Sequence, residues 1–180
     1  MKIIPTEIPD VCIIKPRIFA DDRGYFFESY NREKFLKSAL DLNFIQDNES
    51  RSMKGVLRGL HFQQHPYAQG KLVRVMRGAV LDVAVDIRKK SPTYGKWVSI
   101  VLTGDNKYMY WIPEGFAHGF LTLEDDTVFF YKCTNVYDKA SEGSIRWNDP
   151  DLNINWGTDN PILSDKDKVS PLFKDLKTSF

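Results

Sequence analysis

The stretch Val80-Leu81-Asp82-Val83-Ala84-Val85-Asp86-Ile87 alternates between two kinds of side chain over most of its length. In an extended strand, odd-numbered residues share one face and even-numbered residues share the other. The odd face is then wholly apolar, with Leu81, Val83, Val85 and Ile87, while the even face carries Asp82, Ala84 and Asp86. This period of two predicts a β-strand, and the runs around it decide the predicted fold.

Similar short runs lie on both sides of this strand at short, regular intervals. They cover residues 11–19, 25–30, 44–50, 56–63, 71–76, 96–102, 107–112, 117–123 and 127–135. Turns rich in glycine, proline and aspartate separate several of them, as at 21–24 and 91–95. Such spacing predicts an all-β fold, an antiparallel sandwich or barrel. Two short helices, near 31–40 and 171–177, are expected at its periphery.

Composition restricts the class of protein. The chain has 180 residues, of which 42% are hydrophobic, so we expect one folded domain over residues 1–180, with an N-terminal arm. A tail after Tyr137, where the apolar pattern weakens, is expected to lie over the barrel. The net charge of +1 argues against a nucleic-acid partner, and no apolar run is long enough to span a membrane. Cys12 and Cys133 lack zinc spacing, so we expect reduced thiols and a cytoplasmic location.

One strand, Leu57-Arg58-Gly59-Leu60-His61-Phe62-Gln63, sets a permanent cation and a titratable imidazole into an apolar frame. Two readings stay open from this stretch alone. Arg58 and His61 fit a binding site for an anionic substrate that loses a proton. They also fit an ordinary strand with one hydrogen-bonded histidine and one arginine that extends to solvent.

A second motif lies in Ile112-Pro113-Glu114-Gly115-Phe116-Ala117-His118-Gly119-Phe120. Its Pro-x-Gly-x-x-His spacing resembles the second motif of the cupin superfamily, in which the histidine points into a barrel. Many cupins bind a metal through a His-x-His pair, but this chain has Gln63 where the second histidine would stand. His65 lies beyond strand spacing, beside Pro66. We therefore expect a cavity without a metal.

Three further residues are candidates for acid–base chemistry, each with an ordinary alternative. Lys71 opens a strand and is either a solvated lysine or an ammonium that stabilises an enolate oxygen, held there by Asp82. Tyr131 is either a core tyrosine or a proton donor. Asp167 is either one of many charges in a solvated tail or the carboxylate that orients His61.

Several segments together, in one order along nearly the whole chain, carry a family likeness. They are Asp22–Tyr30, Phe44–Asn48, Val56–Gln63, Gln69–Arg74, Asp82–Arg88, Trp111–Phe120 and Ser141–Ile145. In these segments the chain resembles the dTDP-4-dehydrorhamnose 3,5-epimerase family of the cupin superfamily. The resemblance implies a cupin-type antiparallel jelly roll that works as a homodimer in dTDP-L-rhamnose biosynthesis, without metal or other cofactor.

The resemblance also implies roles for individual residues, with dTDP-4-dehydro-6-deoxy-D-glucose as the substrate. His61 would be the base, oriented by Asp167, and Tyr131 would be the acid on the opposite face. Lys71 would stabilise the enolate oxygen with His118 nearby. The substrate-binding residues implied are Arg23, Phe26, Glu28, Gln46, Asp47, Asn48, Arg58, Glu142 and Lys166.

Three other functions remain as alternatives. The nearest is an epimerase that acts at C3 or C5 only, or a ketoisomerase on the same barrel, because fold alone does not separate these reactions. A metal-dependent cupin such as a dioxygenase is a second. A sugar-nucleotide-binding protein without activity is a third, although binding alone would not need the acid–base residues. The resemblance also implies that a strand near the N-terminus is exchanged between subunits, with Arg23 reaching the partner's site.

Overall fold

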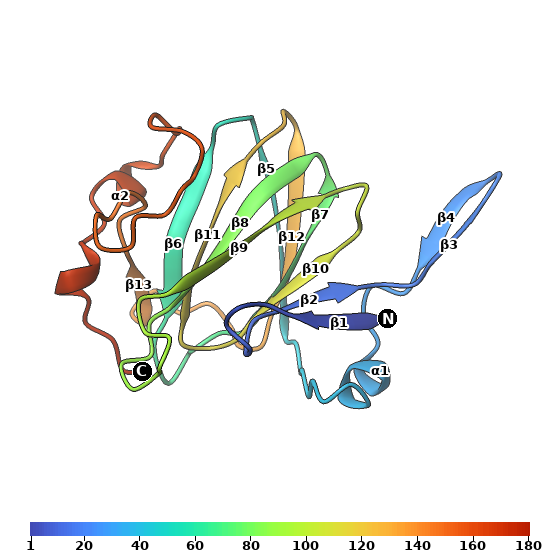
Figure 1. Ribbon diagram of the computed structural model, residues 1–180, viewed down its shortest axis with the longest axis horizontal. Helices are drawn as coiled ribbons and strands as arrows, with labels where there is room; N and C mark the ends of the chain where they lie inside the picture. The colour runs from blue at the N-terminus through green and yellow to red at the C-terminus, as the bar shows by residue number, and fades with distance from the viewer.

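The computed structural model describes residues 1–180 as two antiparallel sheets packed face to face, with a projecting hairpin (Figure 1). In order across the first sheet, the strands are β1 (Lys2–Pro5), β2 (Cys12–Lys15), β10 (Met109–Ile112), β7 (Lys71–Arg77), β12 (Thr127–Cys133) and β5 (Gln46–Ser52). The second sheet has β13 (Glu142–Ser144), β6 (Leu57–Gln63), β11 (Phe116–Thr122), β8 (Ala79–Asp86) and β9 (Trp97–Thr103). This is the predicted all-β jelly roll.

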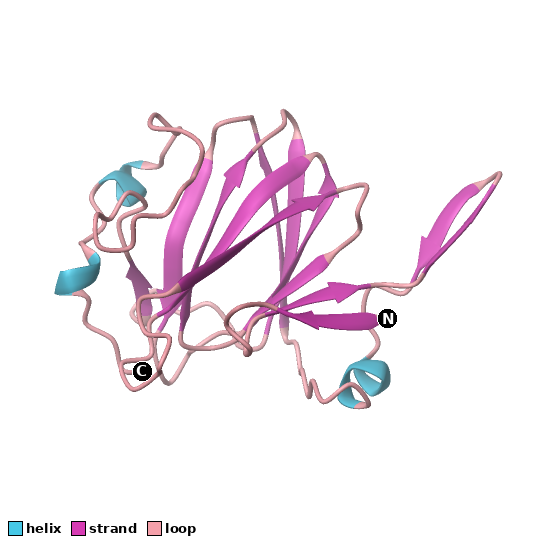
Figure 2. Cartoon of the chain, in the orientation of Figure 1, coloured by secondary structure: helices cyan, strands magenta, loops and turns pink.

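Helices are few and lie at the periphery, as Figure 2 shows and as the sequence predicts. They are α1 (Arg32–Leu36), α2 (Asp165–Lys168) and a 3₁₀ turn (Phe173–Asp175). The first is shorter than the predicted range 31–40. Asn31 caps its start by accepting a hydrogen bond from the Lys34 N–H, and Ala39, just beyond its end, has a left-handed φ of 62°. No helix of the structure is both long and apolar enough to cross a membrane.

The space between the two sheets is filled by apolar side chains from both of them. Val73 and Val75 of β7, Tyr110 of β10 and Phe129 of β12 meet Phe120 of β11 in this core. In β8 the even-numbered face points into it, because Val80 and Ala84 belong to the same cluster. The two carboxylates on that face, Asp82 and Asp86, are therefore placed inside the molecule, where each requires hydrogen-bonding partners.

The odd-numbered face of β8 points the other way and is covered by the tail. Val83, Val85 and Ile87 are fully buried in a second cluster with Leu152, Ile154 and Trp156 of the tail. The tail also adds the short strand β13 beside β6 (Figure 1). The tail thus lies over this face of the barrel, and β8 is buried on both of its faces.

The N-terminal arm ends in a hairpin that stands away from the barrel (Figure 1). The predicted strand 11–19 breaks at Pro16 into β2 and β3 (Ile18–Asp21), and β3 pairs only with β4 (Gly24–Phe27). Phe19, Tyr25 and Phe26 on this hairpin are 51%, 58% and 68% exposed. Large apolar residues exposed together indicate a surface that another molecule covers.

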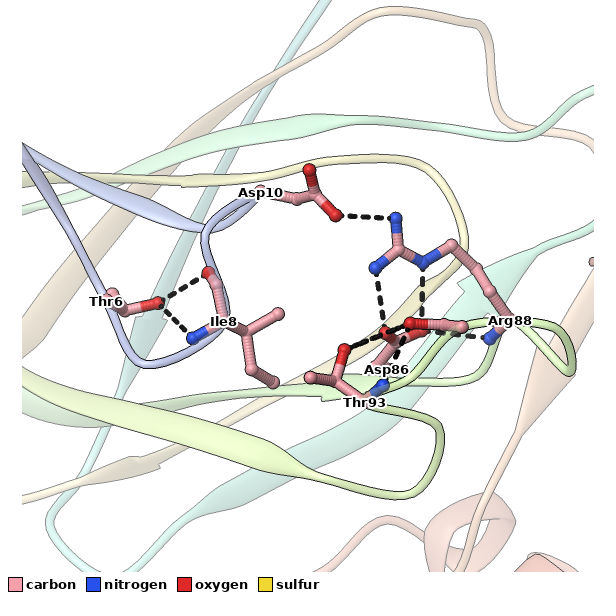
Figure 3. A network of polar contacts seen from close by, with 7 residues as sticks. Thr6, Ile8, Asp10, Asp86, Arg88 and Thr93 are labelled. Atoms are coloured by element: carbon pink, nitrogen blue, oxygen red, sulfur yellow. Dashed lines mark hydrogen bonds and ion pairs between the residues drawn. The ribbon is translucent and has the colours of Figure 1, made fainter.

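A buried polar network ties the arm to one end of β8 (Figure 3). The Asp86 carboxylate accepts hydrogen bonds from Ser91, Thr93 and Arg88, and Arg88 also reaches Asp10 at 2.8 Å. Figure 3 shows Asp10 on the turn between β1 and β2, next to Ile8. The arm is thus fixed to the barrel on one side, while its hairpin is free on the other.

Candidate functional site

A cavity with two adjoining lobes opens between the two sheets. The first lobe has a volume of about 380 Å³ and is lined by Ser50, Arg58, His61, Lys71, His118, Phe120, Phe129, Tyr131 and tail residues from Ile162 to Asp167. The second lobe, of about 270 Å³, is lined by Gln46, Asn48, His61, Gln63, Gln69, Lys71, Tyr131, Tyr137 and Glu142. His61, Lys71 and Tyr131 belong to both lobes, so they lie where the lobes join.

Two histidines lie side by side on neighbouring strands. His61 of β6 and His118 of β11 are paired in register, and both line the first lobe. Between them and the next registered pair, the two strands approach closely at Gly59 and Gly119. A Cβ on Gly59, whose φ is 130°, would stand 2.5 Å from the Gly119 Cα. Only glycine permits this approach, which explains why a glycine stands at each of these two positions.

The tail supplies the partner of His61. Nε2 of His61 lies 2.6 Å from Oδ1 of Asp167, whose side chain is only 3% exposed. Ser164 caps α2, and its hydroxyl accepts a hydrogen bond from the Asp167 N–H. Burial pushes the pKa of Asp167 up, but the hydrogen bond and charge of His61, with bonds from Ser164 and the Gly59 backbone, leave it lowered. Asp167 is therefore an anion that fixes the orientation of the imidazole.

The opposite wall carries a tyrosine and a lysine from the six-stranded sheet. Tyr131 is half-buried on β12, and Lys71 opens β7. Burial raises the pKa of the Tyr131 hydroxyl, while the Arg58 guanidinium acts against that shift. Burial lowers the pKa of the Lys71 ammonium. A phenol that holds its proton and a desolvated ammonium thus face His61 across the junction of the lobes.

Asp82 has a different partner from the one expected. Its carboxylate lies 2.9 and 3.0 Å from Nε2 of His118, and it makes no ion pair with Lys71. Any hold of Asp82 on Lys71 is therefore not a direct ion pair. The strand register explains why Asp82 meets His118. Asp82 lies opposite Phe120 on β11, and His118 is two residues along that strand.

The rim of the cavity carries charged and amide groups. Arg58 contacts only the Ser52 hydroxyl, at 3.2 Å, and has no carboxylate partner. Lys166 pairs with Glu142, whose other oxygen accepts from the Tyr137 hydroxyl. Burial acts to raise the pKa of Glu142, but the hydrogen bond and charge of Lys166 leave it lowered. Arg58 is therefore a cation of the rim that is free to meet an anionic group.

Four of the predicted binding residues do not line the cavity of their own chain. Asp47 alternates with Gln46 and Asn48 on β5, so its side chain points to the outer face and pairs with Lys132. Arg23 and Phe26 lie on the projecting hairpin, and Arg23 pairs with Asp21. Glu28 follows the hairpin and bonds Asn31 and Lys34. The other predicted residues, Gln46, Asn48, Arg58, His118, Glu142 and Lys166, line one lobe or the other.

Some lining residues were missed by sequence reasoning. Ser50 shares the inward face of β5 with Gln46 and Asn48, so the alternation of that strand contained the signal. Ser164 was hidden because a capping serine before a four-residue helix has no periodic pattern around it. Tyr137 and Gln69 lie in loops, where position in the sequence does not indicate which way a side chain points.

The two histidines of the cavity are not arranged as a pair of metal ligands. No group of three or more histidine, cysteine, aspartate or glutamate side chains is placed to bind a metal ion. Nε2 of each histidine is bonded to a carboxylate. His65 lies outside the cavity, where its ring packs 5.0 Å from that of Phe180. The arrangement instead offers a base, an acid on the opposite wall, and cations for an anionic substrate.

Comparisons with known proteins give one consistent family. Residues 5–175 match the family model described as dTDP-4-dehydrorhamnose 3,5-epimerase. The enzyme of that name from Shigella flexneri is 55% identical over 176 residues, which is 97% of each chain. An epimerase from Legionella pneumophila, solved in complex with dTDP-4-keto-L-rhamnose, superposes with a TM-score of 0.94 at 48% identity, over 98% of this chain and 94% of that one.

A relative of narrower activity also matches. The 3'-monoepimerase of Streptomyces bikiniensis has a TM-score of 0.89 and 35% identity, over 94% of this chain and 87% of that one. It has also been solved as a double mutant in complex with dTDP, with one histidine changed to asparagine and one tyrosine to phenylalanine. Those two positions lie 70 residues apart in its sequence, as His61 and Tyr131 do here.

Proposed function

Because the chain belongs to the dTDP-4-dehydrorhamnose 3,5-epimerase family, we propose that its cavity inverts C3 and C5 of dTDP-4-dehydro-6-deoxy-D-glucose. The product, dTDP-4-dehydro-L-rhamnose, is an intermediate of dTDP-L-rhamnose biosynthesis. The observation that carries this proposal is the placement of His61 and Tyr131 on facing walls, with Lys71 at the junction of the lobes. This is the set of groups that an epimerisation beside a ketone requires.

The chemistry follows from the position of the C4 ketone. C3 and C5 both flank it, so loss of a proton from either carbon gives an enolate with its charge on the C4 oxygen. His61 takes the proton, and the Lys71 ammonium stabilises the oxygen. Tyr131 then gives its proton to the opposite face of the same carbon. One C–H bond breaks and another forms with inversion, after which His61 loses its proton and Tyr131 regains one.

Asp167 gives His61 the strength that this step needs. A carboxylate on Nε2 fixes the ring and leaves Nδ1 to act as the base. Positioned acid–base groups of this kind typically contribute about 10²–10⁴-fold each. The histidine and tyrosine that were replaced in the monoepimerase have the spacing of His61 and Tyr131, which supports the choice of these two residues.

The nucleotide part of the substrate is assigned to the rim. Arg58 has donors left over and no carboxylate partner, so we place the diphosphate beside it. Gln46, Asn48, Glu142 and Lys166 supply amide and charged groups for the rest of the substrate. The proposed steps use only groups of the chain itself, so we infer that no cofactor takes part. A stoichiometric metal whose removal abolishes turnover would contradict that inference.

We also infer that the protein is a cytoplasmic homodimer. The support is the hairpin, whose exposed Phe19, Tyr25 and Phe26 leave an apolar surface that a second copy would cover. In such a dimer, Arg23 and Phe26 would reach the partner's cavity and complete its substrate site. Asp47 and Glu28, which face away from the cavity of their own chain, are assigned supporting roles near that contact.

The proposal is tested by deuterium uptake. The protein is incubated with dTDP-4-dehydro-6-deoxy-D-glucose in heavy water, and NMR follows label at each sugar carbon. Label at C3 and C5 that His61→Ala abolishes and His65→Ala preserves is the expected result, because His65 lies outside the cavity. Label at one carbon would assign the chain to the single-position branch. No label with bound nucleotide would contradict the proposal.

A further inference from the structure

Asp82 is a buried charge that the proposed reaction leaves without a role. It lies in the middle of β8 and is 0% exposed. Both carboxylate oxygens face Nε2 of His118, at 2.9 and 3.0 Å. His118 in turn lines the first lobe, with its ring packed over that of Phe129 at 6.2 Å and 22°. Asp82 therefore reaches the cavity through a histidine that it holds in place.

Burial leaves the pKa of Asp82 raised, although the charge and hydrogen bond of His118 and the charge of Lys71 favour its ionised form. Nε2 of His118 is the only hydrogen-bond partner of the carboxylate, and it donates to Asp82 in the tautomer that carries its proton there. The almost equal distances to its two oxygens are those of an N–H directed at a carboxylate.

The positive charge of Lys71 has no anion in direct contact to balance it. Its ammonium makes no ion pair and no hydrogen bond with the protein, and burial lowers its pKa. Three acidic groups act on it through space, and they are Cys133, Asp82 and Glu142. Burial raises the pKa of the Cys133 thiol, so near neutral pH it carries no charge. Glu142 is already paired with Lys166, which leaves Asp82, bonded only to the His118 ring, as the remaining anion.

We propose that Asp82 is a positioning residue for the epimerisation, which fixes the His118 ring and supplies the negative charge that keeps Lys71 an ammonium. This inference rests on the proposed function, since it gives Lys71 its task at the C4 oxygen. A desolvated lysine without a counter-charge loses its proton more readily and then no longer stabilises an enolate. Asp82 acts on the reaction through these two residues and does not touch the substrate.

Few other groups can produce the same dependence on pH. The titratable side chains around Asp82 and Lys71 are His61 on β6, His118 on β11, Tyr110 on β10, Cys133 and Tyr131 on β12, and Glu142 on β13. On the β9 side, the residue paired with Asp82 is Ile100, which is apolar. Burial raises the pKa of the Tyr110 hydroxyl, so this group stays neutral over the working range.

The test replaces Asp82 by asparagine and follows turnover against pH. Asp82→Asn keeps the size of the side chain and an acceptor for His118, but it removes the charge. We expect kcat to fall by about 10-fold or more, because loss of one oxyanion donor costs about 10²–10³-fold. The alkaline limb of the profile, where Lys71 loses its proton, should move down by about one pH unit. Affinity for dTDP should stay within about twofold.

Asp86→Asn is the matched control. Asp86 lies on the same strand and the same face and is equally buried, but it is bonded to Arg88 outside the cavity. This variant should lose stability and keep the wild-type alkaline limb. If the alkaline limb of Asp82→Asn lies at the wild-type pH, or at the same pH as that of Asp86→Asn, the inference is overturned. If instead the proposed function is wrong, the wild-type protein itself will neither epimerise the substrate nor exchange its protons with solvent.

A second measurement decides the matter if Asp82→Asn does not fold. The side chain of Lys71 is titrated by NMR in the wild-type protein, with Lys71→Met to assign its signal. An ammonium that persists through pH 7 in this cavity is the expected result. A neutral amine at pH 7 would show that no anion maintains its charge, and the inference would fail.

Discussion

The Asp86 network should make the stability of the protein depend on pH in a calculable way. Burial acts to raise the pKa of Asp86, but five hydrogen bonds, from the Arg88 N–H, two Arg88 guanidinium nitrogens, Ser91 and Thr93, lower it from 3.8 to about 2. A lowered pKa means that folding is stabilised while Asp86 is ionised. This contribution is complete above about pH 5 and is lost as the pH falls towards 2.

The magnitude follows from the shift. A difference of about 1.8 pKa units, at ~1.36 kcal/mol per unit, corresponds to roughly 2.5 kcal/mol of folding free energy at neutral pH. Asp86→Asn should remove at least that amount, because the amide cannot accept every bond and Arg88 loses its partner. For a chain of this length, the expected loss in Tm is roughly 5–10 °C. At pH 3, where the wild type has itself lost about 1 kcal/mol of this term, the two proteins should differ by less.

Urea unfolding of both proteins at several pH values between 7 and 3 measures this effect. Asp10→Asn is the control, because Asp10 makes one bond to Arg88 and its side chain is 55% exposed. Loss of this bond should lower the free energy of unfolding by less than ~1 kcal/mol. A difference between wild type and Asp86→Asn that is below ~1 kcal/mol at pH 7, or that does not shrink on acidification, would refute the reasoning.

Three further predictions concern the cavity. Asp167→Asn should lower kcat by about 10²–10⁴-fold with a smaller change in KM, as steady-state kinetics would show, because the base loses its partner. Tyr131→Phe should impair epimerisation while proton exchange survives at one carbon, and wild-type turnover would remove tyrosine as the acid. Arg58→Ala should weaken dTDP binding at least tenfold by calorimetry. Arg51→Ala, which breaks only an exposed pair with Asp126, should not.

Local patterns were sufficient to predict most of the sheets. Alternation identified β8, and glycine, proline and aspartate turns separated its neighbours, because these signals reflect the geometry of a single strand. The elements that escaped prediction were β1, β13 and α2, which have four residues or fewer. They form because the rest of the molecule offers them a sheet edge or a packing surface, and a short segment carries no record of that.

The residues of the candidate site likewise fall into those that local patterns predict and those that they do not. His61, His118, Lys71 and Tyr131 lie on long strands, so their direction follows from alternation once the fold is known. Asp167 is different, because its contact with His61 spans 106 residues and depends on how the tail crosses β6. The tail is fixed there by pairing of Val56 with Ile162 and by the Ser164 cap. Only the resemblance to a family predicted that contact; the residues alone left it open.

The two buried carboxylates of β8 show how one pattern serves two purposes. Asp82 and Asp86 are four residues apart on the same face, and both are fully buried. Asp86 is surrounded by five donors, which more than offset its burial, so its pKa falls and its charge stabilises the fold. Asp82 has a single ring nitrogen, so burial prevails and its pKa rises. A buried, ionised carboxylate with too few hydrogen-bond donors lowers the stability of the fold. A nearby cation can balance its charge, and Lys71 in the cavity is such a cation.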